Sequence, residues 1–139
     1  MKKILLNLLL FGFFFYAFTN CKKDEDNDPD IDPRDKYVGT WLCTEDTPKK
    51  NTKIAYTVTI NLDPGNSSQI LLYNFNLFGP SENVHGLVTN NVVTVPVQTV
   101  SNTTVDGKGN LIDNNTMNWL YYVNDGADID TISAIYQKQ

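Results

Sequence analysis

The chain has 139 residues and a formal net charge of −5, from 11 Lys and Arg against 16 Asp and Glu. Without its first 20 residues, which carry two lysines and no acid, the net charge becomes −7. An acidic chain that has no basic patch repels nucleic acid, so we expect no nucleic-acid partner. The length is enough for one domain.

The first 20 residues predict a signal peptide. Lys2 and Lys3 precede about fifteen mainly apolar positions, ILLNLLLFGFFFYAF, which is the order of a secretory signal. This run is shorter than the roughly 20 residues that a membrane-spanning helix needs. We therefore assign residues 1–20 to a signal peptide that is removed from the mature chain.

One cysteine stands at the end of the apolar run. The sequence Phe18-Thr19-Asn20-Cys21 resembles the lipobox of bacterial lipoproteins, in which a peptidase cuts just before a diacylglyceryl cysteine. The resemblance implies lipidation at Cys21, and two or three acyl chains such as palmitate hold a protein firmly to a membrane. The alternative is ordinary cleavage near residues 17–19, which leaves Cys21 as a plain thiol.

A short charged stretch follows the cysteine and resembles the surface-export signal of Bacteroidetes-type lipoproteins. The resemblance implies an outer-membrane protein that faces outward at the cell surface. The alternative is a charged tether that only keeps the lipid end soluble. The residues of this stretch are Lys22, Lys23, Asp24, Glu25 and Asp26.

Residues 21–35 predict a flexible tether. Positions 22–35 carry seven acids and three bases and are interrupted by Pro29 and Pro33, so they cannot bury apolar surface. The acids also match the spacing of a calcium loop, but Pro29 occupies the position where that loop needs Gly. A solvated linker is the better interpretation, and we expect no metal site.

Residues 36–139 predict an all-β domain. Apolar and polar residues alternate over 56–62 and, less cleanly, over 117–123, which indicates strands with one buried face. No segment after residue 35 shows a helical period over three turns. Further strands are expected within residues 68–75, 83–89, 92–100, 103–109 and 130–138.

Turn residues separate these segments. Residues 63–66, 79–81 and 124–126 contain the Gly, Pro, Asn and Asp that favour turns, and Asn90-Asn91 predicts a two-residue hairpin turn. Residues 106–110, DGKGN, are compatible with either a turn or a bulged strand. Seven or eight short strands indicate an antiparallel barrel or sandwich.

The domain also resembles a set of small Bacteroidetes-type lipoproteins with a lipocalin-like β domain. The resemblance lies in residues 37–41, 56–60, 74–75, 93–98 and 106–109, taken in order. Gly39-Thr40-Trp41 is similar to the Gly-x-Trp element of lipocalins, whose Trp closes one end of the barrel. The resemblance implies fold and location, and that set mostly has no assigned activity.

The side chains expected to point inward are bulky, which favours a filled interior over a ligand cavity. They are Trp41, Tyr56, Val58, Ile60, Leu62, Val93, Val95, Trp119, Tyr121 and Val123.

Catalytic residues and cofactors are not expected. His85 is the single histidine, no nucleophile motif surrounds it, and we expect it to face solvent. Cys43 shares a strand face with Trp41, which predicts a small buried residue. The neighbouring acids Glu45-Asp46 and Asp128-Asp130 could in principle serve glycoside hydrolysis, but in so acidic a chain their adjacency is better explained by chance.

The sequence thus predicts an outer-membrane lipoprotein that is not an enzyme and that binds a protein or glycan partner. Two alternatives stay open: a lipocalin-like carrier of a small apolar ligand, and an inhibitor of another organism's enzyme. Tyr73, Tyr122, Tyr136 and Phe78 are candidate exposed aromatic residues for such a partner. Asp130-Thr131-Ile132 resembles a three-residue O-glycosylation motif, which makes Thr131 a candidate modification site. The oligomeric state is left open.

Overall fold

The structure, a computed structural model, describes residues 31–47 and 52–139. The signal peptide, the lipidation site at Cys21 and the export stretch at residues 22–26 lie outside these ranges. The compact folded unit runs from Asp32 to Gln139, so it begins earlier than the Lys36 expected from the sequence. No helix in the described ranges has the length and apolar character needed to cross a membrane.

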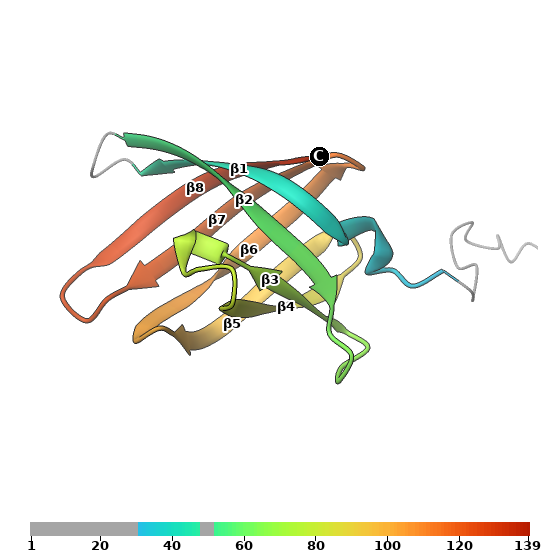
Figure 1. Cartoon of the computed structure of the whole chain (residues 1–139), viewed down its shortest axis with the longest axis horizontal. Helices are drawn as coiled ribbons and strands as arrows, with labels where there is room; N and C mark the ends of the chain where they lie inside the picture. Colours follow the sequence, from blue (N-terminus) through green and yellow to red (C-terminus); the bar gives the residue numbers. More distant parts are fainter. Residues whose placement is uncertain (1–30, 48–51) are drawn as a thin grey trace, which may run out of the picture. The chain divides into compact units, whose positions relative to one another are not determined.

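Eight antiparallel strands form one closed barrel (Figure 1). Each strand pairs with the next, and β1 also pairs with β8, so the sheet closes on itself. This confirms the all-β expectation and decides for a barrel over a sandwich. The strands are β1 (Gly39–Thr47), β2 (Thr52–Leu62), β3 (Gln69–Tyr73), β4 (Asn83–Thr89), β5 (Val92–Val100), β6 (Thr103–Asp113), β7 (Thr116–Asn124) and β8 (Ile129–Lys138).

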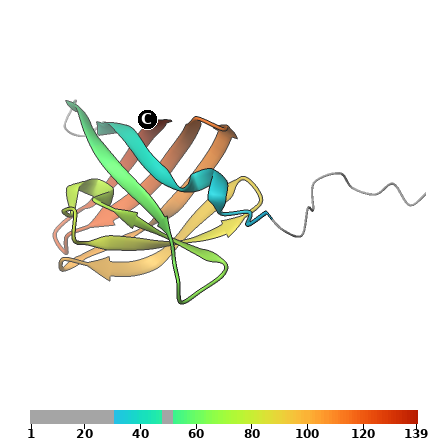
Figure 2. The same cartoon turned by 45° about the vertical axis from the view of Figure 1, so that its right-hand side comes forward.

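The described ranges also contain two short 3₁₀ helices. Helix η1 (Asp35–Tyr37) precedes β1, and η2 (Phe75–Leu77) follows β3. They lie at opposite ends of the barrel in both cartoon views (Figures 1 and 2). We call these two ends the η1 end and the η2 end.

The alternating sequence pattern fills the barrel with side chains. In β2, Val58 and Ile60 are fully buried, while Thr57 and Asn61 on either side of them are exposed. Strand β7 does the same with Met117, which is fully buried, and Trp119, which is nearly so. Every member of the expected inward set is either buried in the core or packed against it, which confirms that prediction.

Glycines in β6 make room for the largest side chains of β7. A Cβ at Gly109 would lie 2.4 Å from the Trp119 ring, and one at Gly107 would lie 2.4 Å from Cβ of Tyr121. Residues 106–110 are therefore continuous strand, which settles the choice between strand and turn. The register shifts of this strand's pairings lie elsewhere, in β5 between Val95 and Gln98 and near the end of β6 between Leu111 and Asp113.

The predicted turns connect the strands as expected. Asn90 and Asn91 join β4 to β5, and Asn90 has the positive φ of 52° that such a turn requires. The segment from Asn124 joins β7 to β8, with Gly126 at φ 92°. Both connections are short, so consecutive strands lie side by side in the barrel.

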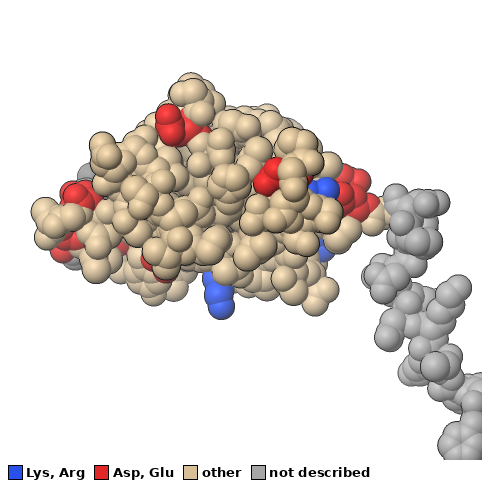
Figure 3. All heavy atoms as spheres, turned by 90° about the horizontal axis from the view of Figure 1, so that it is seen from below, with Lys and Arg blue, Asp and Glu red and all other residues tan. Residues whose placement is uncertain are grey.

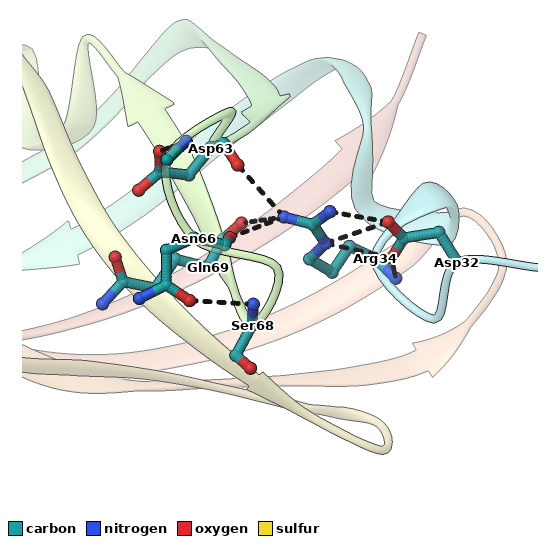
Figure 4. A network of polar contacts seen from close by, with 7 residues as sticks. Asp32, Arg34, Asp63, Asn66, Ser68 and Gln69 are labelled. Carbon is teal, nitrogen blue, oxygen red and sulfur yellow. Dashed lines mark hydrogen bonds and ion pairs between the residues drawn. The ribbon is translucent and has the colours of Figure 1, made fainter.

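Arg34 fastens the start of the domain to the η1 end (Figure 4). Its Nη1 donates hydrogen bonds to the carbonyl oxygens of Asp63, Asn66 and Gln69, at 3.3, 2.8 and 2.9 Å. Its Nε and Nη2 donate to the carboxylate of Asp32, and this hydrogen bonding lowers the pKa of Asp32. These contacts order residues 32–34, which explains why the folded unit begins before Lys36.

Trp41 and Lys138 complete the η1 end. The indole Nε1 of Trp41 donates to the carbonyl of Tyr37 at 2.8 Å, and Lys138 Nζ lies 5.3 Å from the Trp41 ring centroid. The Tyr37 hydroxyl donates to the carbonyl of Asn90 at 3.1 Å. Trp41 thus lies at one end of the barrel, as the resemblance of residues 39–41 implied.

Candidate functional site

A carboxylate lies inside the barrel, near the η2 end. Glu45 continues the inward face of β1 after Trp41 and Cys43, and its side chain is 4% exposed. Its neighbour Asp46 points outward and is exposed. The two acids therefore cannot act as a pair, and Glu45 is the one with an unusual environment.

Two tyrosine hydroxyls donate hydrogen bonds to the same oxygen of Glu45. Tyr56 of β2 and Tyr121 of β7 both reach Oε1. No described residue donates a hydrogen bond to Oε2, and no Lys, Arg or His within residues 31–47 and 52–139 forms an ion pair with Glu45. Burying a carboxylate is costly unless it is compensated, so this arrangement requires an explanation.

Cys43 and Tyr136 adjoin the carboxylate on the barrel wall. In the register of the sheet, Cys43 lies directly between Tyr56 on β2 and Tyr136 on β8. Burial raises the pKa of the Cys43 thiol to about 12. Burial likewise raises the pKa of Tyr136 well above its usual value. Cys43 is thus a small buried residue, as its sequence position predicted.

We call this group the Glu45 cluster. Its members are Cys43, Glu45, Tyr56, Trp119, Tyr121 and Tyr136.

Two polar atoms of the Glu45 cluster have no hydrogen-bond partner among the described residues. They are the indole Nε1 of Trp119 and the hydroxyl of Tyr136, and both are buried. The two rings lie against each other, with centroids 5.3 Å apart. Buried N–H and O–H groups without partners are rare in folded proteins, because each loses its bond to water without a replacement.

Helix η2 covers the Glu45 cluster. Phe75 is fully buried and its ring centroid lies 4.6 Å from that of Tyr121 and 5.6 Å from that of Trp119. Asn76 Oδ1 lies 3.4 Å from the Tyr121 hydroxyl oxygen. Figure 2 shows η2 at the end of the barrel opposite to η1.

The backbone of this cover is strained. Asn74, Asn76 and Leu77 all have left-handed φ values, of 60°, 51° and 59°. Asn tolerates this conformation, whereas a branched residue such as Leu77 adopts it only when the surrounding structure requires it. The burial of Phe75 and the hydrogen bonds of Asn74 to Thr57 and Gly79 hold this segment over the Glu45 cluster.

A second candidate site lies outside the barrel, across β5, β6 and β7. It is a groove of about 530 Å³. Tyr122 is 39% exposed, Leu120 is 47% exposed and Val97 is 73% exposed. Polar side chains of Asp106 and Lys108 lie between these apolar ones, opposite Tyr122 and Leu120 in the register. We call this site, with Pro96 and Asn110 also in its lining, the Tyr122 groove.

The remaining candidate aromatic residues differ in their exposure. Tyr136 is fully buried in the Glu45 cluster, so the expectation that it offers an exposed face is wrong. Tyr73 is half-buried and lines another outer groove, between β2 and β3. Phe78 packs against the core. Tyr122 is thus the candidate with an accessible ring.

His85 and Thr131 both face outward. His85 is exposed, and its Nδ1 lies 3.7 Å from Asp63 Oδ2. Thr131 lies on β8, is exposed, and pairs with Tyr122 across the sheet. Its hydroxyl is accessible beside the Tyr122 groove, and its modification stays a prediction.

The acids do not gather into a metal site within the described ranges. Figure 3 shows one face of the molecule on which neutral residues dominate and charged groups are few.

Comparisons with known proteins support the fold. No protein-family model matches the sequence, and no curated protein sequence matches it. A solved structure of a redesigned beta barrel superimposes with a TM-score of 0.59 at 14% sequence identity, over 78% of this chain and 96% of that chain. At this identity the likeness concerns the fold. The chain therefore contains a closed, eight-stranded antiparallel β-barrel domain, an architecture that lipocalin-like barrels share.

Proposed function

We propose that this chain is a lipid-anchored outer-membrane lipoprotein, displayed at the cell surface, whose lipocalin-like barrel binds a glycan or protein partner without catalysis. The lipid anchor is attached at Cys21, and the charged stretch at residues 22–26 is the surface-export signal. The barrel supplies the binding surface. The observation that carries the binding proposal is the Tyr122 groove on the outside of the barrel.

The groove fits a partner on the outside better than a small apolar ligand on the inside. Bulky side chains fill the barrel, so a carrier of the ordinary kind would need space that they occupy. Outside, exposed Leu120 and Tyr122 provide apolar contact that no other part of the described structure covers. Aromatic residues of this kind are frequent anchors of binding interfaces.

The polar side chains of the groove favour a glycan over a protein. A sugar ring offers one apolar face, which suits the Tyr122 ring, and hydroxyl groups, which suit Asp106 and Lys108. The carboxylate accepts and the ammonium donates hydrogen bonds, so both kinds of sugar hydroxyl contact are available. The groove has the combination of apolar and polar groups that small-molecule sites use.

The groove is tested by binding measurements on Tyr122→Ala. On a glycan array, we expect this variant to bind the glycans recognised by the unmodified protein about tenfold more weakly, since the loss of one stacked aromatic contact costs up to about 1.5 kcal/mol. Tyr73→Ala, in the other outer groove, is the matched control and should bind normally. Equal binding by both variants would show that Tyr122 is not part of the site. Capture of a protein instead, lost on the same substitution, would assign the groove to a protein partner.

The anchor is tested separately, with the two cysteines as test and control. Cys21→Ala should abolish metabolic palmitate labelling and release the protein from membranes, because the thioether can form only on that thiol. Cys43→Ala should stay labelled, because Cys43 is buried in the barrel. A Cys21→Ala protein that is still labelled and membrane-bound would contradict the proposed anchor. Neutral replacements at residues 23–26 should lower protease accessibility on intact cells while labelling persists.

A further inference from the structure

The Glu45 cluster lies away from the Tyr122 groove and has chemistry that the proposed function does not use. We propose that it is a second binding site, inside the η2 end of the barrel, for a small organic cation that also carries an oxygen acceptor, such as an amino alcohol. The proposal rests on three observations: a buried carboxylate, a surround of aromatic rings, and two buried donors without acceptors.

The carboxylate provides the charge that a cation would meet. Glu45 is 4% exposed, and its two described hydrogen bonds both come from neutral tyrosine hydroxyls. Hydroxyl groups compensate a buried carboxylate only in part. A positively charged group beside Oε2 would complete the compensation, and none of the cations in the described ranges supplies it.

Aromatic side chains adjoin the carboxylate. Tyr56 and Tyr121 donate hydrogen bonds to it, Trp119 and Tyr136 lie ring against ring, and the Phe75 ring covers Trp119 and Tyr121. The faces of aromatic rings attract cations, and cages of several rings around a carboxylate suit quaternary or alkylated ammonium groups. These aromatic side chains thus favour an organic cation over a metal ion, because a metal ion would need more oxygen ligands than the single carboxylate offers.

The two orphan donors specify the rest of the ligand. Trp119 Nε1 can only donate, and the Tyr136 hydroxyl has a proton to donate, yet neither has an acceptor. Each would be satisfied by an oxygen atom bound in the cluster. A ligand with an ammonium group for Glu45 and a hydroxyl oxygen for these donors meets both requirements.

Helix η2 provides the entrance. The Phe75 ring occupies the space against Trp119 and Tyr121, so a ligand enters by displacing it. The left-handed backbone of Asn74, Asn76 and Leu77 favours such a movement, because leaving this conformation relieves strain. Ala134, which pairs with Glu45 on β8, presents only a methyl group beside the carboxylate.

The experiment titrates the purified full-length chain with choline chloride and follows the two indole N–H signals by nuclear magnetic resonance. The chain has two tryptophans. The signal of Trp119 should shift, because its free N–H acquires an acceptor. That of Trp41 should not, because its N–H is already bonded to Tyr37 at the other end of the barrel. The neutral carbon isostere of choline, dimethylbutanol, should bind at least about tenfold more weakly, because it lacks the charge.

Substitution then tests the carboxylate. Glu45→Gln keeps an oxygen that can accept the tyrosine hydrogen bonds, so the fold should persist, but choline affinity should fall on the order of thirtyfold. Glu82→Gln, at an exposed acid, is the matched control and should bind as the unmodified chain does. A titration without any shift at Trp119, equal binding of dimethylbutanol, or undiminished binding by a folded Glu45→Gln variant would each overturn the proposal. The Tyr122→Ala variant should bind choline normally, which separates this site from the outer groove.

Discussion

Arg34 shows how one side chain can set where a domain begins. Its guanidinium satisfies three carbonyl oxygens of the β2–β3 connection and pairs with Asp32. The planar group can reach several acceptors at once, which a lysine cannot do. The hydrogen bond and charge of Asp32 raise the pKa of Arg34, which keeps it charged at every relevant pH.

Replacing Arg34 should therefore destabilise the barrel. We expect Arg34→Met to lower the free energy of unfolding by about 2 kcal/mol, since the three carbonyl groups keep only their backbone N–H donors and Asp32 loses its partner. Urea denaturation followed by tryptophan fluorescence measures the change. Lys36→Met, which removes an exposed hydrogen bond to Asn91, should cost a few tenths of a kcal/mol. Equal effects of the two substitutions would contradict the role assigned to Arg34.

Glu45 is the residue that the sequence interpretation missed. It was considered together with Asp46 as a chance pair of acids, although a strand places such neighbours on opposite faces. The inward alternation of Trp41 and Cys43 extends to Glu45, so the signal was present in the pattern. The tyrosines that bind it come from β2 and β7, and their approach depends on barrel closure, which no local pattern encodes.

At the level of the strands, the alternation of apolar and polar residues predicts the strand positions well. The segments 83–89 and 92–100 agree with β4 and β5 in full, because polar turn residues bound them on both sides. Helix η2 was not predicted. Two of its residues and Asn74 just before it are left-handed, and they accompany the burial of Phe75, a tertiary contact that overrides local preference.

Pairing between β6 and β7 depends on small residues facing large ones. We expect Gly109→Ala to lower the free energy of unfolding by about 1–3 kcal/mol, because its Cβ would overlap the Trp119 ring. Thermal unfolding followed by circular dichroism measures the loss. Asn110→Ala, at the exposed neighbouring position of β6, should unfold within a few degrees of the unmodified chain. A stable Gly109→Ala variant would mean that the two strands are less closely packed than described.

For the whole molecule, the number and order of the strands are predictable from the sequence, whereas the closure of the sheet into a barrel is not. Seven or eight strands could be counted from the sequence, whereas the choice between barrel and sandwich was open. The decisive contact joins β1 to β8, the two strands farthest apart along the chain. Closure also removes exposed strand edges, which otherwise promote aggregation.

The many buried tyrosines predict how stability depends on pH. Burial raises the pKa of both Tyr37 and Cys43 to about 12, and it raises those of Tyr121 and Tyr136 above their usual values. Above about pH 9 to 10 the unfolded chain loses these protons while the folded chain keeps them. The unfolded state then binds fewer protons, so stability falls as the pH rises.

We therefore expect the free energy of unfolding to be constant up to about pH 8 and to fall toward about pH 12, by about 1.4 kcal/mol per pH unit for each such group. Urea denaturation at a series of pH values measures this fall. Tyrosinate absorbance of the buried rings should appear together with unfolding and not before it. An unfolding free energy that stays level through pH 11 would show that these hydroxyls ionise equally in both states.

The attachment of Arg34 at the η1 end has a mechanical consequence for a chain held by its N-terminus. A pull on that terminus first loads the hydrogen bonds from Arg34 to the β2–β3 connection, and then acts along β1. Strand β1 is hydrogen-bonded on both sides, to β2 and to β8, so the load is shared by two ladders in shear and does not open them one bond at a time. A domain tethered in this way resists tension at the point where its tether would apply it.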